Sequence, residues 1–245
     1  MALVSPNGTF VVVALLLVLA AVVASRLTRL GVETDVVTAG ARGAVQLSLV
    51  ALIIAAVLDH RWASLLFVLG MLTAAAFTSA HRIADRRAAG WAGVAIAAGA
   101  LPVLLLVFGS GVVPFSGASI VAICGIVIGN AMNATSQAGR RAMDELRARV
   151  GEYEAALSLG FEQRAAGLEI ARPTAAQALI PPLDQTRTVG LVTLPGAFIG
   201  VLLGGGSAGE AAAAQLLVLF ALLAAEIVAV AVVLEFVVRG VVRRA

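Results

Sequence analysis

Several polar side chains lie inside apolar runs, where a polar group has to be paired, protonated or exposed to water. Glu226 lies in the run AALLAAEIVAVAVV, where insertion of an acid costs about 2.5 to 3.5 kcal/mol. Asn130 and Asn133 are three residues apart in a second run, and Arg42 and Gln46 are four apart in a third. Polar residues inside a membrane are default candidates for a transport path or a gate.

The asparagine and arginine positions also allow purely structural roles. Asn133 extends a stripe of small residues, Gly125 and Gly129, at four-residue intervals. Such a stripe predicts close helix packing, so these residues either hold helices together or line the path. Arg42 and Gln46 share one helix face and either anchor their helix near the cytoplasmic boundary or contribute to gating.

A proline in a further apolar run predicts a local distortion. Pro195 and Gly196 stand in TLPG, ahead of two overlapping GxxxG spacings. Because proline removes a backbone donor, the helix is expected to kink here, either as a hinge in transport or as a packing feature. Glu235 is nearer the end of its run and can extend towards the headgroups.

The sequence contains no recognisable catalytic set. Its single cysteine provides neither a disulfide framework nor a cysteine-based metal site. His60 and His81 either lie at solvated loop ends or form a metal-ligand pair, so metal ligands stay unknown. Metalloprotease, nucleophile-elbow and phosphate-loop motifs are absent. We therefore expect no catalytic residue, no ATPase activity and no cofactor in this chain.

The composition indicates an integral membrane protein in a lipid bilayer, with no nucleic-acid partner. Of its 245 residues, 61% are hydrophobic and 13% are charged, against about 45–50% and 25% in soluble domains. A bilayer core of about 30 Å needs roughly 20 apolar residues per helix. Seven runs qualify: Gly8–Ser25, Gly40–Leu58, Trp62–Ala80, Gly90–Phe108, Phe115–Ala138, Thr188–Gly204 and Ala211–Val238.

The arginines predict the orientation of these spans, because positively charged loops stay in the cytoplasm. With the N-terminus outside and the C-terminus inside, only Arg61 of the 17 basic residues falls on the outer side. The prediction is an all-α, multi-pass protein of the cell inner (plasma) membrane, with residues 1–245 forming a single transmembrane domain. The one sizeable cytoplasmic excursion covers about residues 139–187.

This excursion has an amphipathic pattern. Apolar residues recur at three- and four-residue spacing from Val150 to Phe161, while glutamates occupy another side. Gly160 predicts a turn, and Ala165–Ala171 predicts a second short helix that Pro173 ends. A helix lying on lipid headgroups is one interpretation, although its glutamates disfavour an anionic membrane surface.

The same stretch resembles the EAA loop of ABC-transporter permeases. Glu154, Ala155 and Ala156, followed at the family spacing by Gly160 and Ile170, carry this resemblance, with arginine instead of leucine before Pro173. In the transporters it resembles, this loop is a helix-turn-helix that docks onto a cytoplasmic ATPase. The resemblance therefore implies a coupling role for these five residues.

A wider set of motifs resembles the FetB-type iron-export permease family, whose plant relatives are linked to aluminium tolerance. In order, the motifs are RGAVQLSLV, GNAMNATS, ALIP, TVGLVTLPG and GGGSAGEAA, and the similarity spans about Arg42 to Gln215. The resemblance implies a homodimeric permease that exports its solute with a separate ABC ATPase, which binds the ATP and magnesium. After LPG the chain has Ala197, Phe198 and Ile199 where we expect methionines and polar residues, so the solute is an iron-like metal ion or another small solute.

The predicted function is thus the permease subunit of an ATP-driven exporter. The alternative is a secondary transporter or channel, driven by an ion gradient through Glu226. Such proteins often contain inverted repeats, and none is convincing here.

Overall fold

The computed structural model describes residues 7–84 and 88–242, and over these ranges the chain is built from helices and connecting loops. By length and composition, six helices can cross a membrane, as expected for an all-α, multi-pass membrane protein. They are α1 (Gly8–Thr28), α2 (Glu33–Asp59), α3 (Arg61–Ile83), α4 (Ala89–Gly109), α5 (Gly117–Ala148) and α10 (Ala208–Val238). Four arginines of the orientation prediction, Arg86, Arg87, Arg243 and Arg244, lie outside the described residues.

The chain separates into two compact units, of which the first ends at Val57. Within it, the Ser25 hydroxyl donates to the Glu33 carboxylate at 3.0 Å and closes the turn between α1 and α2. Apolar side chains on both helices are exposed, including Leu17 at 67% and Leu52 at 79%. Exposed aliphatic side chains of this kind suit contact with lipid.

The second unit, from Leu58 onwards, is built around α3, α4, α5 and α10. α3 and α5 are parallel, because Met71 lies at Gly125 and Ile83 lies at Gly139. α4 is antiparallel to α10: Gly99 lies at Ala225, and the Trp91 ring contacts Phe236 with centroids 5.1 Å apart.

Small residues set the close approach of these helices. A Cβ at Gly99 would overlap the Ala225 carbonyl oxygen and lie 3.0 Å from the Ala229 Cβ. Between helices in lipid, such close backbone packing replaces much of the hydrophobic driving force available in water. The predicted close contact at Gly129 is wrong within this chain, since no described heavy atom lies within 4 Å of a Cβ placed there.

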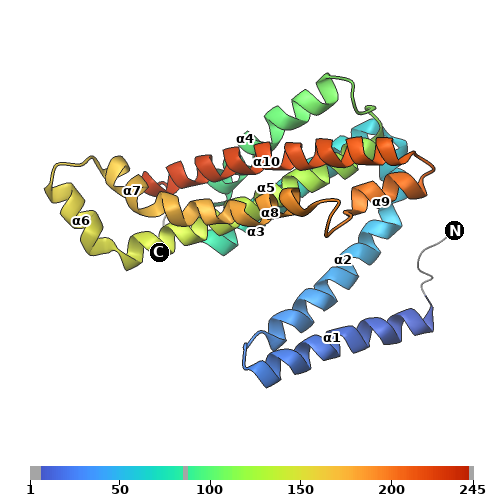
Figure 1. Cartoon of the computed structure of the whole chain (residues 1–245), viewed down its shortest axis with the longest axis horizontal. Coiled ribbons are helices and arrows are strands. Elements are labelled where there is room, and N and C mark those ends of the chain that lie inside the picture. The colour runs from blue at the N-terminus through green and yellow to red at the C-terminus, as the bar shows by residue number, and fades with distance from the viewer. Residues whose placement is uncertain (1–6, 85–87, 243–245) are drawn as a thin grey trace. The chain divides into compact units, whose positions relative to one another are not determined.

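α5 and α10 are also parallel, and this determines the path of the chain between them. Ile123 and Leu217 meet near the starts of the two helices, and Met143 and Val237 meet near their ends. The chain must therefore run back along the bundle before α10 begins. It does so through α7 (Gln163–Ala176), the 3₁₀ turn η2 (Gln177–Leu179), α8 (Ile180–Thr188) and α9 (Gly196–Leu203) (Figure 1).

The predicted sixth span, Thr188–Gly204, is therefore not one continuous helix. Gly190 adopts a φ of +80°, its N–H donates to the Thr193 carbonyl at 2.9 Å, and Pro195 is the N-cap of α9. The proline precedes a helix here instead of kinking one. With eight residues, α9 extends only about 12 Å, so this return path is a broken one.

A helix, a turn and a second helix lie at the end of the bundle where α10 finishes (Figure 1). α6 (Val150–Ser158) follows α5 directly, and Gly160 then turns the chain with a φ of +89°. Contrary to the prediction, Pro173 lies inside α7 and does not end it. The carbonyl that loses its donor belongs to Glu169, an exposed residue that water can reach.

Candidate functional site

Glu226 is the most unusual polar residue of the bundle. Its side chain is only 3% exposed, and its Oε2 atom has no hydrogen-bond partner among the described residues. It is the nineteenth residue of α10, a helix of 31 residues. A carboxyl group at this depth has a large desolvation cost unless something neutralises it.

The carboxyl group borders a cavity of about 160 Å³ between α5, the segment from η2 to α8, and α10. Most of its other lining residues are amides and prolines. They are Asn130, Asn133, Ala134, Gln137, Ala178, Pro181, Pro182 and Gln185. The structure thus brings together three of the predicted path residues, Glu226 and the two asparagines, in one polar cavity.

The two asparagines present different groups to this cavity. The Asn130 amide nitrogen donates to the Ile126 carbonyl at 2.9 Å, which leaves its amide oxygen as an acceptor. Asn133 is exposed, and its amide oxygen accepts from Arg82 at 3.2 Å. Asn133 therefore holds the Arg82 guanidinium, while Asn130 has an oxygen available for a ligand.

Two consecutive prolines change the backbone on the α8 side. In a helix the Ala178 carbonyl would accept from the N–H of residue 181 or 182, but these are Pro181 and Pro182. Since proline has no N–H, this carbonyl lacks its usual helical donors. All three residues line the cavity, so a further acceptor belongs to this region.

A second, basic cavity adjoins the first. Arg82, Asn133, Ser136, Gln137 and Arg140 line a space of about 220 Å³, and Asn133 and Gln137 line both cavities. The Ser136 hydroxyl fixes this wall by bonding the Met132 carbonyl at 2.7 Å. An acidic compartment and a basic one thus adjoin along the inner face of α5.

The five residues that carry the EAA resemblance lie on α6, on the turn at Gly160 and on α7. Glu154 and Ala155 are exposed on α6, Ala156 is half-buried, and Gly160 forms the turn. Ile170 lies further on, 4% exposed within α7. Four of the five residues therefore belong to α6 and its turn, while Ile170 packs α7 onto the bundle.

Ion pairs attach this region to its neighbours. Arg164 on α7 bonds both oxygens of Glu235 on α10, at 2.5 and 3.0 Å, and Arg239 bonds the same carboxylate at 2.6 Å. The hydrogen bond to Glu235 raises the pKa of Arg164. At the base of α6, Arg149 bonds Glu152 and holds the pKa of that carboxyl below its usual range.

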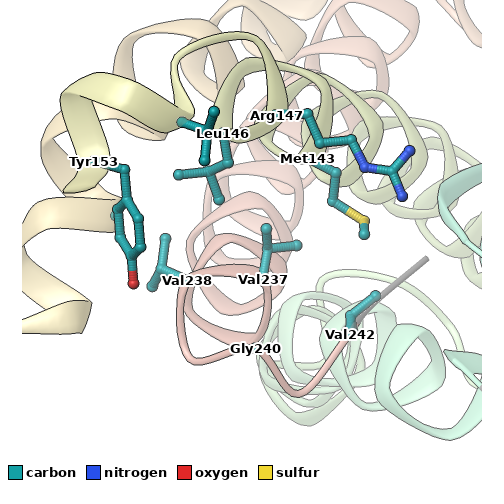
Figure 2. A pocket seen from close by; sticks show the side chains of 10 residues that line it. Met143, Leu146, Arg147, Tyr153, Val237, Val238, Gly240 and Val242 are labelled. Atoms are coloured by element: carbon teal, nitrogen blue, oxygen red, sulfur yellow. The ribbon is translucent and has the colours of Figure 1, made fainter. Parts of the chain in front are cut away.

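An apolar cavity of about 390 Å³ lies behind α6. It is bordered by the end of α5, by Tyr153 of α6, by Gly167 of α7 and by the end of α10, with Val237 and Val238. In Figure 2 the Tyr153 ring extends beside Val238, and the Arg147 guanidinium points away on the far side of Met143. The inner side of α6 thus borders open space, and its glutamates are on the exposed side.

The other predicted path residues do not line the Glu226 cavity. Pro195 and Gly196 stand at the start of α9, beyond the break in the return path. Arg42 and Gln46 are exposed on α2 in the first unit. Their predicted roles in gating or lining stay predictions.

Sequence reasoning missed the lining residues Gln137, Pro181, Pro182 and Gln185. Gln137 lies one helical turn after Asn133, so helical spacing could have added it. The paired prolines after Ala178 signalled an unusual carbonyl. Gln185 gave no signal, because it lies in a segment predicted to be a cytoplasmic loop.

Comparison with known proteins gives consistent family matches. A family model described as "Uncharacterised protein family (UPF0014)" matches residues 9–242. The chain is 34% identical to the Oryza sativa protein named UPF0014 membrane protein STAR2, over 85% of this chain and 74% of that protein. No solved structure matches the chain.

Two further relatives extend this comparison. The Arabidopsis thaliana Protein ALUMINUM SENSITIVE 3 is 31% identical, over 84% of this chain and 77% of its own length. The Escherichia coli protein named Probable iron export permease protein FetB is 31% identical, over 86% of this chain and 82% of its own length. The family resemblance predicted from the ordered motifs is confirmed.

Proposed function

Since the chain belongs to the UPF0014 family of membrane proteins, we propose that it is the permease subunit of an ATP-driven exporter of a metal ion or another small solute. The name of the Escherichia coli relative supports transport of this kind. A separate cytoplasmic ABC ATPase would bind the ATP and magnesium. This chain would supply the membrane path, without catalytic activity of its own.

The observation that carries the proposal is the contrast across the Gly160 turn. α6 before the turn has no buried residue, whereas α7 after it buries Ala166, Gly167, Leu168, Ile170, Ala171 and Ala175. An exposed helix joined through a short turn to a packed one is suited to receiving force from a partner. Glu152 and Glu154 on α6, with Glu162 after the turn, give this region an acidic surface, which an anionic membrane would repel.

The ion pairs provide a route from this turn to the cavity. A displacement of α6 would move α7, and the Arg164–Glu235 pair would transmit it to α10. Glu235 lies nine residues from Glu226 on the same helix, roughly 13 Å along its axis. The apolar cavity behind α6 gives that helix space to tilt without disturbing the core.

The path itself would follow the polar face formed by α5, α8 and α10. Asn133 and Gln185 are exposed there, at the level of Glu226. Polar side chains at this depth need water or a protein partner in place of lipid. A second copy of the chain, with the path between the two copies, meets that need, and the proposed assembly is a homodimer in the inner membrane.

The proposed orientation has the N-terminus outside and α6 in the cytoplasm, from the arginine distribution. A cysteine at Ser207, in the α9–α10 loop, should then react with a membrane-impermeant reagent from outside. A cysteine at Ser158, on α6, should react only after permeabilisation. The reverse pattern would contradict this orientation.

The decisive experiment reconstitutes the chain with candidate ATPases and measures ATP-dependent export from proteoliposomes. Gly160→Val should uncouple ATP hydrolysis from export, because valine does not readily adopt a φ of +89°. Gly111→Val is the matched control: Gly111 has a φ of +74° in the α4–α5 loop at the opposite end of the bundle. Export without any ATPase would instead favour a gradient-driven transporter that uses Glu226.

A further inference from the structure

We propose that the cavity between α5, α8 and α10 binds a small, hard cation through oxygen ligands, with Glu226 as its one charged ligand. This proposal rests on the proposed function in one respect: it takes the bound cation to be the solute that the permease carries. Binding itself is a property of this chain and can be measured without any ATPase.

The first argument is that the Glu226 carboxyl group has no counter-charge in the described lining of the cavity. Among the described residues, it is the only ionisable one that lines this cavity. Arg82 of α3 is bound to Asn133, and Arg140 of α5 lines the adjoining cavity but not this one. On α8, Asp184 and Arg187 pair with each other at 3.1 Å.

α4 and α7, which also pack against α10, contribute no residue to the described lining of the cavity. α4, which contacts α10 at Gly99, contains no charged residue. On the side of α7, Arg164 is bound to Glu235, towards the end of α10. When Glu226 is ionised, its charge therefore needs a cation that enters the cavity.

The second argument is that three groups around the cavity are oxygen acceptors without a described donor. The Glu226 Oε2 atom has no described partner, and Asn130 uses its amide nitrogen on Ile126, so its oxygen is available. The Ala178 carbonyl lacks its helical donors because residues 181 and 182 are prolines. Several acceptors around one cavity need a positively charged or donating group between them.

The donor types determine the class of ligand. Carboxylate, amide and carbonyl oxygens prefer hard cations, whereas copper(I) and zinc prefer the sulfur and imidazole ligands that this cavity lacks. The described residues contain no group of three or more His, Cys, Asp or Glu that could hold a metal. A single carboxylate implies weak, reversible binding, which transport requires because the ion must also leave.

The dimensions of the cavity agree with this ligand. A volume of about 160 Å³ holds an ion with a few of its waters, since each water takes roughly 30 Å³ in the liquid. The cavity is open on the side of Asn133 and Gln185, both of which are exposed. A partly hydrated cation can therefore enter without unfolding any helix.

The test measures Mn²⁺ binding to the full-length chain in lipid nanodiscs, without ATPase, from the loss of the free Mn²⁺ signal in electron paramagnetic resonance. Mg²⁺ and Na⁺ competition distinguishes divalent from monovalent preference, and Zn²⁺ tests the predicted selectivity. We expect Mn²⁺ to bind, Mg²⁺ or Na⁺ to displace it, and Zn²⁺ to have no advantage. Glu226→Gln should weaken Mn²⁺ binding by at least about tenfold, or 1.4 kcal/mol.

Two further variants complete the design. Glu235→Gln, on the same helix but outside the cavity, should bind Mn²⁺ as the wild type does. Asn130→Ala should weaken binding with Glu226 intact, and it decides the question if Glu226→Gln proves unstable. The proposal is overturned if the wild type does not bind Mn²⁺, or if either cavity variant binds it as tightly as the wild type. A failure of ATPase coupling leaves this measurement unaffected, so the two proposals fail separately.

Discussion

Two glutamates on α10 occupy opposite environments. Glu235 is bound by Arg164 and Arg239 near the end of the helix, whereas Glu226 is buried with an unpartnered oxygen. A glutamate thus joins two helices at position 235, whereas the glutamate at position 226 has an oxygen available for a ligand. A buried polar group in the membrane is most informative where the protein does not itself satisfy it.

The largest effect should come from removing the close contact that positions this part of α10. Gly99→Ala places a Cβ against the Ala225 carbonyl oxygen, which cannot move without moving the helix. We expect destabilisation of about 1 to 3 kcal/mol or more, as for overpacked cores. Thermal unfolding in detergent measures it.

Gly70→Ala on α3 is the matched control, because a Cβ there meets no heavy atom within 4 Å. It should leave the melting temperature unchanged or slightly raised. Equal melting temperatures for the two variants would show that the α4–α10 contact does not position Glu226.

The next effect separates the two glutamates by function. Glu226→Gln should reduce export at least roughly tenfold, since it removes the one charged group of the cavity while keeping its shape. Glu235→Gln should reduce export less, because it loosens α7 but leaves the cavity ligands in place. Export assays in proteoliposomes with the partner ATPase measure both variants. Equal losses of export would contradict the different roles assigned to Glu226 and Glu235.

A smaller effect on export is expected from breaking the Arg164–Glu235 ion pair between α7 and α10. Arg164→Gln breaks the only described ion pair between these two helices, whereas Arg239→Gln removes a pair between α10 and its own C-cap residue. We expect the first to lower the amount of solute exported per ATP hydrolysed, with ATPase binding retained. The second should have little effect, and a reversed order would rule out transmission through Arg164.

The smallest effect concerns Glu152 on α6, an exposed glutamate. Arg149 holds its pKa below the usual range, so the pair stabilises α6 at neutral pH and is lost as the pH falls through that lowered pKa. Glu152→Gln should lower the melting temperature slightly at pH 7, and the difference should shrink below about pH 4. Melting curves at several pH values test this, and a difference that grows in acid would contradict it.

Some features followed from local sequence alone. Of the seven apolar runs predicted to span the membrane, six coincide with long helices, because each helix satisfies its own backbone within the membrane. The glycine at 160 predicts a turn that the structure contains. The ordered motifs identified the family, which its model match confirms. Glu226 could be singled out because an acid in an apolar run is costly wherever its helix packs.

Only the tertiary structure decided what surrounds that acid. The parallel arrangement of α5 and α10 requires a return path, and this path brings residues 178–185 against Asn130 and Glu226. The prediction placed this segment in a loop and Thr188–Gly204 in a continuous helix. Hydropathy measures only the length of an apolar run, and it does not show which helices pack against a polar segment. The groups that surround Glu226 and the open space at Gly129 arise from contacts between distant helices, which local spacing does not encode.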